Sequence, residues 1–108
     1  MKRILLGTVT IQGADKSILD LLKSWTETAS ADINNPQKPL SVKIVRERSR
    51  VIDKLVAVAK DAPHVDVEDG DLDVLKDVIT NTGFVISGPG LVKVIDAVEK
   101  AEAPPTVN

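Results

Sequence analysis

Apolar residues recur with the period of an α-helix in four stretches of this 108-residue chain, at residues 16–29, 42–60, 72–81 and from Pro89 onward. In each stretch the apolar positions lie on one side of a helical wheel and the charged positions on the other. The pattern therefore predicts four amphipathic helices, each with one buried side. The predicted core consists of Ile18, Leu22, Trp25, Ile52, Leu55, Val56, Leu75, Ile79, Val94, Ile95 and Val98.

The start of the chain has a different pattern, which is typical of a β-strand. Residues 3–11 are rich in β-branched and apolar side chains, but their alternation changes phase at Gly7. A bend at Gly7 would bring the apolar residues on both sides of it to one face, namely Ile4, Leu6, Val9 and Ile11. A second, very short strand is expected within residues 64–71. We therefore expect a mainly α fold of the α+β class, with about four helices in a small bundle and a short N-terminal strand or hairpin.

Residues that favour helix ends support these boundaries. Asp15 and Ser41 are expected to cap the first and second helices, and Asp69 or Asp71 the third. Pro89 suits the first position of the fourth helix.

The chain is expected to form one domain. Residues 30–40 are polar and contain two prolines, which is typical of a flexible loop between two helices. The expected single small domain spans residues 1–102, and residues 103–108 form a tail that should fray.

The composition narrows the classes of function. The chain has no Cys, one His, one Trp, one Phe and no Tyr, so disulfides and thiolate chemistry are excluded and the core must be aliphatic. His64 lies beside Pro63 in a connector, and no nucleophile or zinc motif accompanies it. No apolar run has the length of a membrane span, and the N-terminus is not typical of a signal peptide. We expect a soluble cytoplasmic protein that is not an enzyme and binds no cofactor and no metal.

The charge is unevenly distributed along the chain. Residues 1–54 carry a net charge of +4 and residues 55–108 a net charge of −6, which together make the overall −2. The basic half permits binding to an acidic partner. The two halves can also neutralise one another, within one chain or between copies.

The basic charge is densest in the sequence RERSR, at residues 46–50 within the second predicted helix. Around Arg46 and Arg50 the charges alternate in sign, and the spacings of Lys43–Glu47 and Arg50–Asp53 suit ion pairs. This pattern indicates a solvated face that neutralises itself. A helix that binds phosphates usually carries a row of positive charge without interleaved acids.

Arg48 differs from its basic neighbours because the helical wheel places it on the apolar side of the helix. A guanidinium there needs a partner or a route to water. Two interpretations remain open. Arg48 forms an internal ion pair with an acid near the third helix, Glu68, Asp69 or Asp71, or it anchors a partner in a groove on this side of the helix.

Acidic residues are concentrated between Asp66 and Asp73. An EF-hand frame placed on Gly70 fails, because Val65 and Val67 then occupy ligand positions. Acids before and within the first turn of a helix are favoured by the helix dipole, which accounts for most of this cluster without a metal. The later sequence SGPG, residues 87–90, lacks the spacing of a phosphate-binding loop and is explained as a helix start.

The order of elements between Lys38 and Glu102 has a parallel in known proteins. A loop ending in PLS leads into KIVRERSRVIDKLVAVA, followed by VDVEDGDLDVLKDVI and the closing segment FVISGPGLVKVIDAVE. This layout resembles that of small accessory proteins of tailed bacteriophages, encoded among head- and tail-assembly genes. The resemblance implies an accessory role in assembly or in the virion through protein contacts rather than catalysis. It transfers no functional residue to this chain.

The expected function is therefore a non-enzymatic protein–protein interaction module, a bacteriophage assembly or virion accessory protein. Its partner would be another protein or a second copy of this chain, in the host cytoplasm or the virion. The expected partner-binding residues are Arg46, Arg48, Arg50, Lys54, Asp66, Glu68, Asp69, Asp71 and Asp73. One alternative is a small nucleic-acid-binding regulator that uses the basic helix 42–60. Another is an inhibitor that binds a host protein through its acidic segment.

Overall fold

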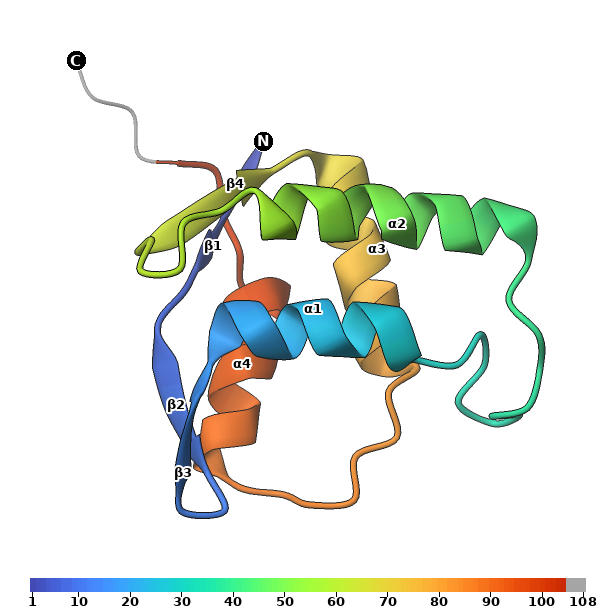
Figure 1. Ribbon diagram of the computed structural model, residues 1–108, viewed down its shortest axis with the longest axis horizontal. Coiled ribbons are helices and arrows are strands. Elements are labelled where there is room, and N and C mark those ends of the chain that lie inside the picture. Colours follow the sequence, from blue (N-terminus) through green and yellow to red (C-terminus); the bar gives the residue numbers. More distant parts are fainter. Residues whose placement is uncertain (105–108) are drawn as a thin grey trace.

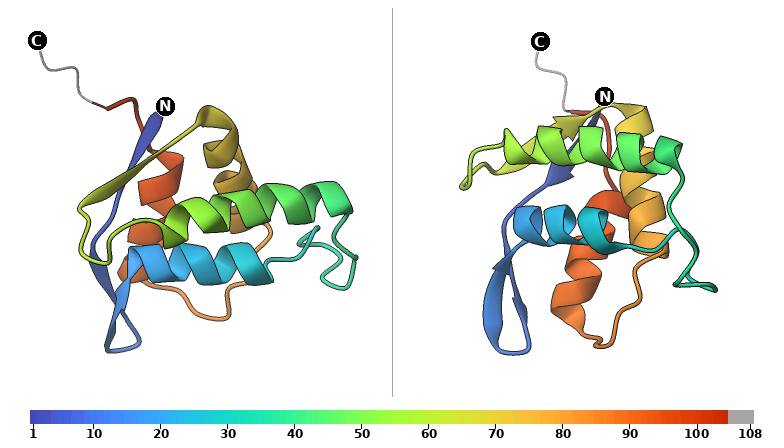
Figure 2. Two further views of the ribbon diagram at one scale, coloured as in Figure 1. Left: turned by 45° about the horizontal axis from the view of Figure 1, so that its top comes forward. Right: turned by 45° about the vertical axis from the view of Figure 1, so that its right-hand side comes forward.

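The computed structural model describes residues 1–104, which form four helices and two pairs of antiparallel strands (Figure 1). The elements are β1 (Lys2–Leu5), β2 (Thr8–Ile11), β3 (Ala14–Ser17), α1 (Ile18–Thr28), α2 (Val42–Val56), β4 (His64–Val67), α3 (Asp69–Thr80) and α4 (Pro89–Glu99). Helices α1 and α2 lie side by side and run in opposite directions, and α3 and α4 run across them behind (Figures 1 and 2). The predicted fold class is confirmed.

The N-terminal segment forms a hairpin rather than one bent strand. The extended segment is interrupted at Gly7, between β1 and β2. The φ of Gly7 is 151°, a value that favours glycine, so the predicted change of direction at this residue is confirmed. Strand β2 then pairs with β3 through a two-residue turn in which Gln12 and Gly13 have φ angles of 53° and 77°. Two consecutive residues with positive φ match the twist of a tight hairpin.

This hairpin shortens the first helix. Helix α1 begins at Ile18, because residues 14–17 belong to β3. The predicted Asp15 cap is therefore wrong, since Asp15 accepts a hydrogen bond from the Thr10 hydroxyl across the hairpin. Ser17 caps α1 instead, and its hydroxyl accepts from the backbone N–H of Asp20 at 3.4 Å.

Strand β1 pairs with β4, although more than fifty residues separate them. The register places Arg3 opposite Asp66 and Ile4 opposite Val65. The backbone N–H of Arg3 also donates to the Glu102 carbonyl at 2.7 Å. Both ends of the described chain are thus held at the same edge of the fold (Figure 1).

Helix boundaries differ from the prediction at two further places. Ser41 caps α2 as expected, accepting from the N–H of Ile44 at 3.2 Å, but the helix ends at Val56 rather than at Lys60. Helix α3 begins at Asp69, and neither Asp69 nor Asp71 is its cap because both lie in its first turn. There they face the positive end of the helix dipole.

The core lies between the two helix layers and is aliphatic. Seven of the predicted core residues are buried, namely Ile18, Leu22, Leu55, Leu75, Ile79, Val94 and Val98. Trp25, Ile52 and Ile95 are half-buried, and the Trp25 ring contacts the edge of Phe84 with 5.0 Å between the ring centres. Val56 was predicted in the core but is 64% exposed, because it points away from α1 and α3 at the end of α2.

Two remaining predictions concern the loop and the tail. No helix or strand occurs between α1 and α2, as expected for residues 30–40. Of the predicted tail 103–108, residues 105–108 lie outside the described residues. Within residues 1–104, no helix has the length and apolar character needed to cross a membrane.

Candidate functional site

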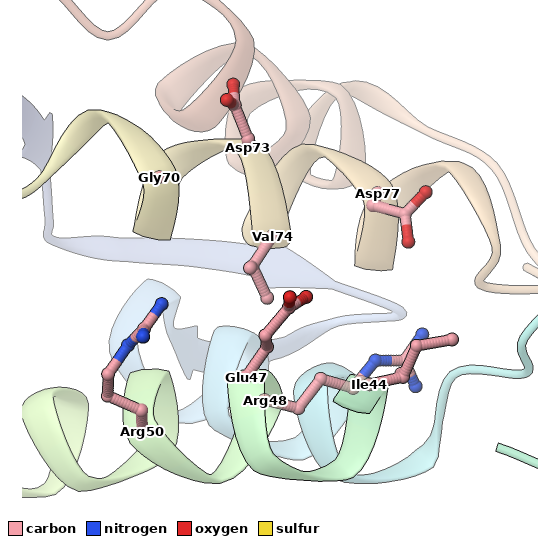
Figure 3. Close-up of a pocket in the computed structure, with 8 residues that line it drawn as sticks. All are labelled: Ile44, Glu47, Arg48, Arg50, Gly70, Asp73, Val74 and Asp77. Atoms are coloured by element: carbon pink, nitrogen blue, oxygen red, sulfur yellow. The ribbon is translucent and has the colours of Figure 1, made fainter. Parts of the chain in front are cut away.

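The residues predicted to bind a partner come mainly from α2 and from the segment that leads into α3. These two helices enclose a groove of about 340 Å³ (Figure 3). It is lined by Ile44, Glu47, Arg48, Arg50, Gly70, Asp73, Val74 and Asp77. Glu47 and Val74 point toward one another across it, whereas Asp73 points away from α2 (Figure 3). The groove therefore has side chains of both charges and no uniform electrostatic character.

Asp71 is the buried acid beside this groove. It is 1% exposed, and its carboxylate accepts from Arg50 at 3.3 Å and from the Lys54 ammonium. Burial raises the pKa of Asp71, but the Lys54 hydrogen bond and charge, with a smaller contribution from Arg50, more than offset burial and lower the pKa below its usual value. Three predicted partner-binding residues thus form one internal ion cluster that fastens α2 to α3.

Arg48 has backbone carbonyls as its partners within the chain. It is 4% exposed, and its guanidinium donates to the backbone carbonyls of Ala29 and Ser30, the latter at 3.0 Å. These carbonyls follow the last turn of α1, where the helix lacks partners for its C=O groups and its dipole is negative. The predicted ion pair with Glu68, Asp69 or Asp71 is therefore wrong, because Arg48 caps the end of α1 instead.

The remaining predicted residues are not brought together at one site. Asp66 pairs with Arg3 across β1 and β4 at 2.9 Å, and the Arg3 hydrogen bond lowers the pKa of Asp66. Asp69 lies 3.6 Å from the N-terminal ammonium group. Glu68 and Asp73 are exposed. The acidic segment is thus not one continuous patch.

Arg46 is an exposed basic residue of α2 that has no acidic partner within residues 1–104. Within residues 1–104 neither Arg46 nor Asp53 forms an ion pair. The predicted Lys43–Glu47 pair is present at 4.0 Å. The predicted Arg50–Asp53 pair is absent, because Arg50 turns to Asp71. The charged groups of Arg46 and Asp53 therefore have no ion-pair partner within residues 1–104 and are available to a partner.

An apolar stripe that was not predicted lies on the same outer side of α2. It consists of Val42, Val45, Ile52 and Val56, with the small polar residue Ser49 at its middle, and its three valines are 68%, 48% and 64% exposed. The spacing alternates between three and four residues, which keeps one line along a helix. This spacing is visible in the sequence, but Ile52 and Val56 were assigned to the core because they adjoin the buried stripe.

His and Cys, side chains that often hold a metal or take part in nucleophilic catalysis, are few in the described chain, which has one His and no Cys. Within residues 1–104 no group of three or more His, Asp or Glu side chains is arranged to hold a metal ion. His64 lies on β4, away from the groove, and no hydroxyl or carboxylate in residues 1–104 is hydrogen-bonded to it.

No protein-family model, no curated protein sequence and no solved structure matches the chain.

Proposed function

We propose that this chain is a non-enzymatic protein-interaction module and that the outer face of α2 is its contact surface. The observation that carries the proposal is the apolar stripe of α2, where three exposed valines lie in line on one helix. Single exposed apolar residues are common on protein surfaces, whereas several of them aligned on one helix face are typical of an interaction site. Helix α2 also lies on the outside of the fold, where a partner can approach it (Figure 1).

The charges beside the stripe support the same use. Arg46 and Asp53 flank it, exposed and without internal partners in the described chain. An apolar centre with charged residues at its rim is the usual anatomy of a protein interface. The rim charges would set the orientation and the rate of encounter more than the affinity.

The more specific role in this proposal is that of an accessory protein in bacteriophage assembly. Its support is the order of elements between Lys38 and Glu102, which resembles the small accessory proteins encoded among head- and tail-assembly genes. Such a role requires protein contacts and no catalysis, in agreement with the character of the α2 surface.

The basic residues of α2 give little support to the nucleic-acid alternative. Of the five basic residues of α2, Arg48 is buried against α1, Arg50 and Lys54 are paired with Asp71, and Lys43 lies 4.0 Å from Glu47. Phosphate binding depends on basic groups that are free to replace counterions. Of these five residues only Arg46 is both exposed and without an acidic partner within residues 1–104, which is a small basis for such a surface.

The experiment compares three forms of the purified protein as bait, namely wild type, Val45→Asp and Val92→Asp. Val92 is a valine of similar exposure, 53%, on α4, so its substitution is a matched control. Captured proteins are identified, purified and titrated against each form. We expect Val45→Asp to weaken binding by about tenfold or more, with Val92→Asp unchanged.

Two results would contradict the proposal. One is a chain that binds neither another protein nor itself. The other is binding to arbitrary DNA duplexes that weakens steeply with added salt, which would restore the nucleic-acid alternative.

A further inference from the structure

The spacing along the apolar stripe of α2 is that of a helix that pairs with another helix. Its positions, 42, 45, 49, 52 and 56, alternate in steps of three and four, as do the inward positions of a two-helix seam. β-Branched residues occupy every position except the middle one, which is Ser49. A small side chain at the centre allows two helix backbones to approach closely.

The stripe is nearly symmetric about Ser49. Val42 and Val56 lie seven residues before and after it, and Val45 and Ile52 lie four before and three after. If a second copy of the helix runs in the opposite direction and crosses at Ser49, Val42 faces Val56 and Val45 faces Ile52. The same apolar pairs then form twice, which is the self-complementarity that a twofold interface requires.

The charges beside the stripe fit the same arrangement. Arg46 lies three residues before Ser49 and Asp53 four after it, and a helical wheel places both on the same flank of the stripe. In the antiparallel arrangement Arg46 of each copy lies beside Asp53 of the other, so two opposite-charge pairs form. In a parallel arrangement the twofold axis runs along the helices and places this flank of the two copies on opposite sides of the seam, so Arg46 of one copy does not lie beside Asp53 of the other. Pairing of opposite charges therefore favours the antiparallel arrangement.

We propose that the occupant of this surface is a second copy of the chain, with the two α2 helices antiparallel around a twofold axis at Ser49. This inference rests on the proposed function and names its partner. Five residues from each helix form the contact, so the dimer is a weak one that dissociates on dilution. It also weakens with added salt, because the two pairs at its rim are exposed.

The decisive test uses two charge variants, Arg46→Asp and Asp53→Arg. The first variant has acidic residues at both rim positions, and the second has basic residues at both. Each variant alone brings like charges together twice across the axis, whereas an equimolar mixture restores both opposite-charge pairs. Sedimentation equilibrium at low salt over a range of concentrations measures the association of wild type, each variant and the mixture.

We expect wild type to dimerise, each variant alone to associate about tenfold or more weakly, and the mixture to recover association near the wild-type strength. Lys43→Asp is the matched control, since it makes the same charge change on α2 away from the stripe. It should dimerise as wild type does. Circular dichroism of each variant establishes that α2 remains folded.

Other outcomes would overturn the pairing. They are a wild type that stays monomeric at every concentration, single variants that associate as strongly as wild type, or a mixture that gains nothing over its components. The capture experiment separates this failure from that of the proposed function. A monomeric wild type that binds another protein, with loss in Val45→Asp, would refute the pairing and leave the proposed function intact.

Discussion

Arg48 is a buried cation whose charge is balanced by backbone carbonyls instead of a carboxylate. Helix α1 has no basic residue in its last turn, and Arg48 supplies one from the neighbouring helix. The guanidinium suits this position because its planar array of N–H groups donates to two adjacent carbonyls at once. A residue that the sequence suggested for partner binding therefore stabilises the fold.

Arg48→Ala should lower the free energy of unfolding by about 2–4 kcal/mol, because it leaves a cavity and deprives two carbonyls of their donor. Arg48→Lys should cost less, since one ammonium replaces part of the donor set. Urea denaturation followed by Trp25 fluorescence measures both. The matched control is Arg46→Ala on the exposed side of α2, with a change within about 0.5 kcal/mol. An Arg48→Ala variant as stable as this control would refute the structural role.

The buried carboxylate of Asp71 predicts opposite effects of acidification on the stability of wild type and of a variant that lacks its basic partners. In wild type its folded pKa is below the unfolded value of about 3.9, so its contribution to stability is present above that pH and is lost as the pH falls through the folded pKa. Asp71→Asn should reduce this loss. The loss of stability on acidification that remains in this variant includes the contribution of Asp66, whose pKa is also lowered, by Arg3.

The double substitution Arg50→Met and Lys54→Met should destabilise the protein by roughly 3 kcal/mol at neutral pH, because it leaves the Asp71 carboxylate buried and unpaired. Burial then acts alone and raises the pKa of Asp71, so mild acidification should stabilise this variant. Urea denaturation at neutral pH and near pH 4 measures the sign. A variant that loses stability on acidification as wild type does would contradict the assigned cluster.

At the scale of elements, α4 is positioned by a close contact with the hairpin. A Cβ at Gly90 would lie 2.2 Å from the carbonyl oxygen of Thr10 in β2, a separation that atoms cannot adopt. The helix approaches the strand closely because glycine occupies this position in its first turn. The sequence SGPG is thus a helix start whose second glycine is required by packing.

Gly90→Ala should lower the free energy of unfolding by about 1–3 kcal/mol, because backbone must move to admit the methyl group. Gly70→Ala is the matched control. Gly70 lies in the first turn of α3, has no positive φ, and a Cβ there would meet nothing within 4 Å. That variant should be stabilised by roughly 0.5–1 kcal/mol, because alanine restricts the unfolded chain. Thermal unfolding of the two variants compares them, and equal effects would contradict the packing argument.

At the scale of the whole molecule, opposite charges from the two halves of the chain meet within one copy. Among residues 1–104, Arg3 pairs with Asp66 between β1 and β4, the N-terminal ammonium group lies beside Asp69, and Arg50 and Lys54 of α2 pair with Asp71 of α3. These contacts join segments that are distant in sequence, and none of them involves the apolar stripe of α2. The proposed dimer would cover that stripe.

The sequence by itself determined the helices, because helical periodicity and capping are local properties. The stripes of all four helices, the Ser41 cap, the Pro89 start and the break at Gly7 depend on residues within a few positions of one another. For the N-terminal segment the sequence predicted either a short strand or a hairpin, and the hairpin is the form observed. Its turn was missed because Gln12–Gly13 is not one of the common turn pairs.

The tertiary structure alone decided which partners the charged residues have and which apolar residues are exposed. The helical wheel already separated Arg48 from Arg46, but only the packing of α2 on α1 gives Arg48 the carbonyls of Ala29 and Ser30 as partners instead of an acid near α3. Val56 matches the buried residues in type and is 64% exposed because it lies on the outer side of α2, in line with Val45 and Ile52. Such outcomes depend on which segments pack together. A helical wheel gives the direction of a side chain but not the element that lies there.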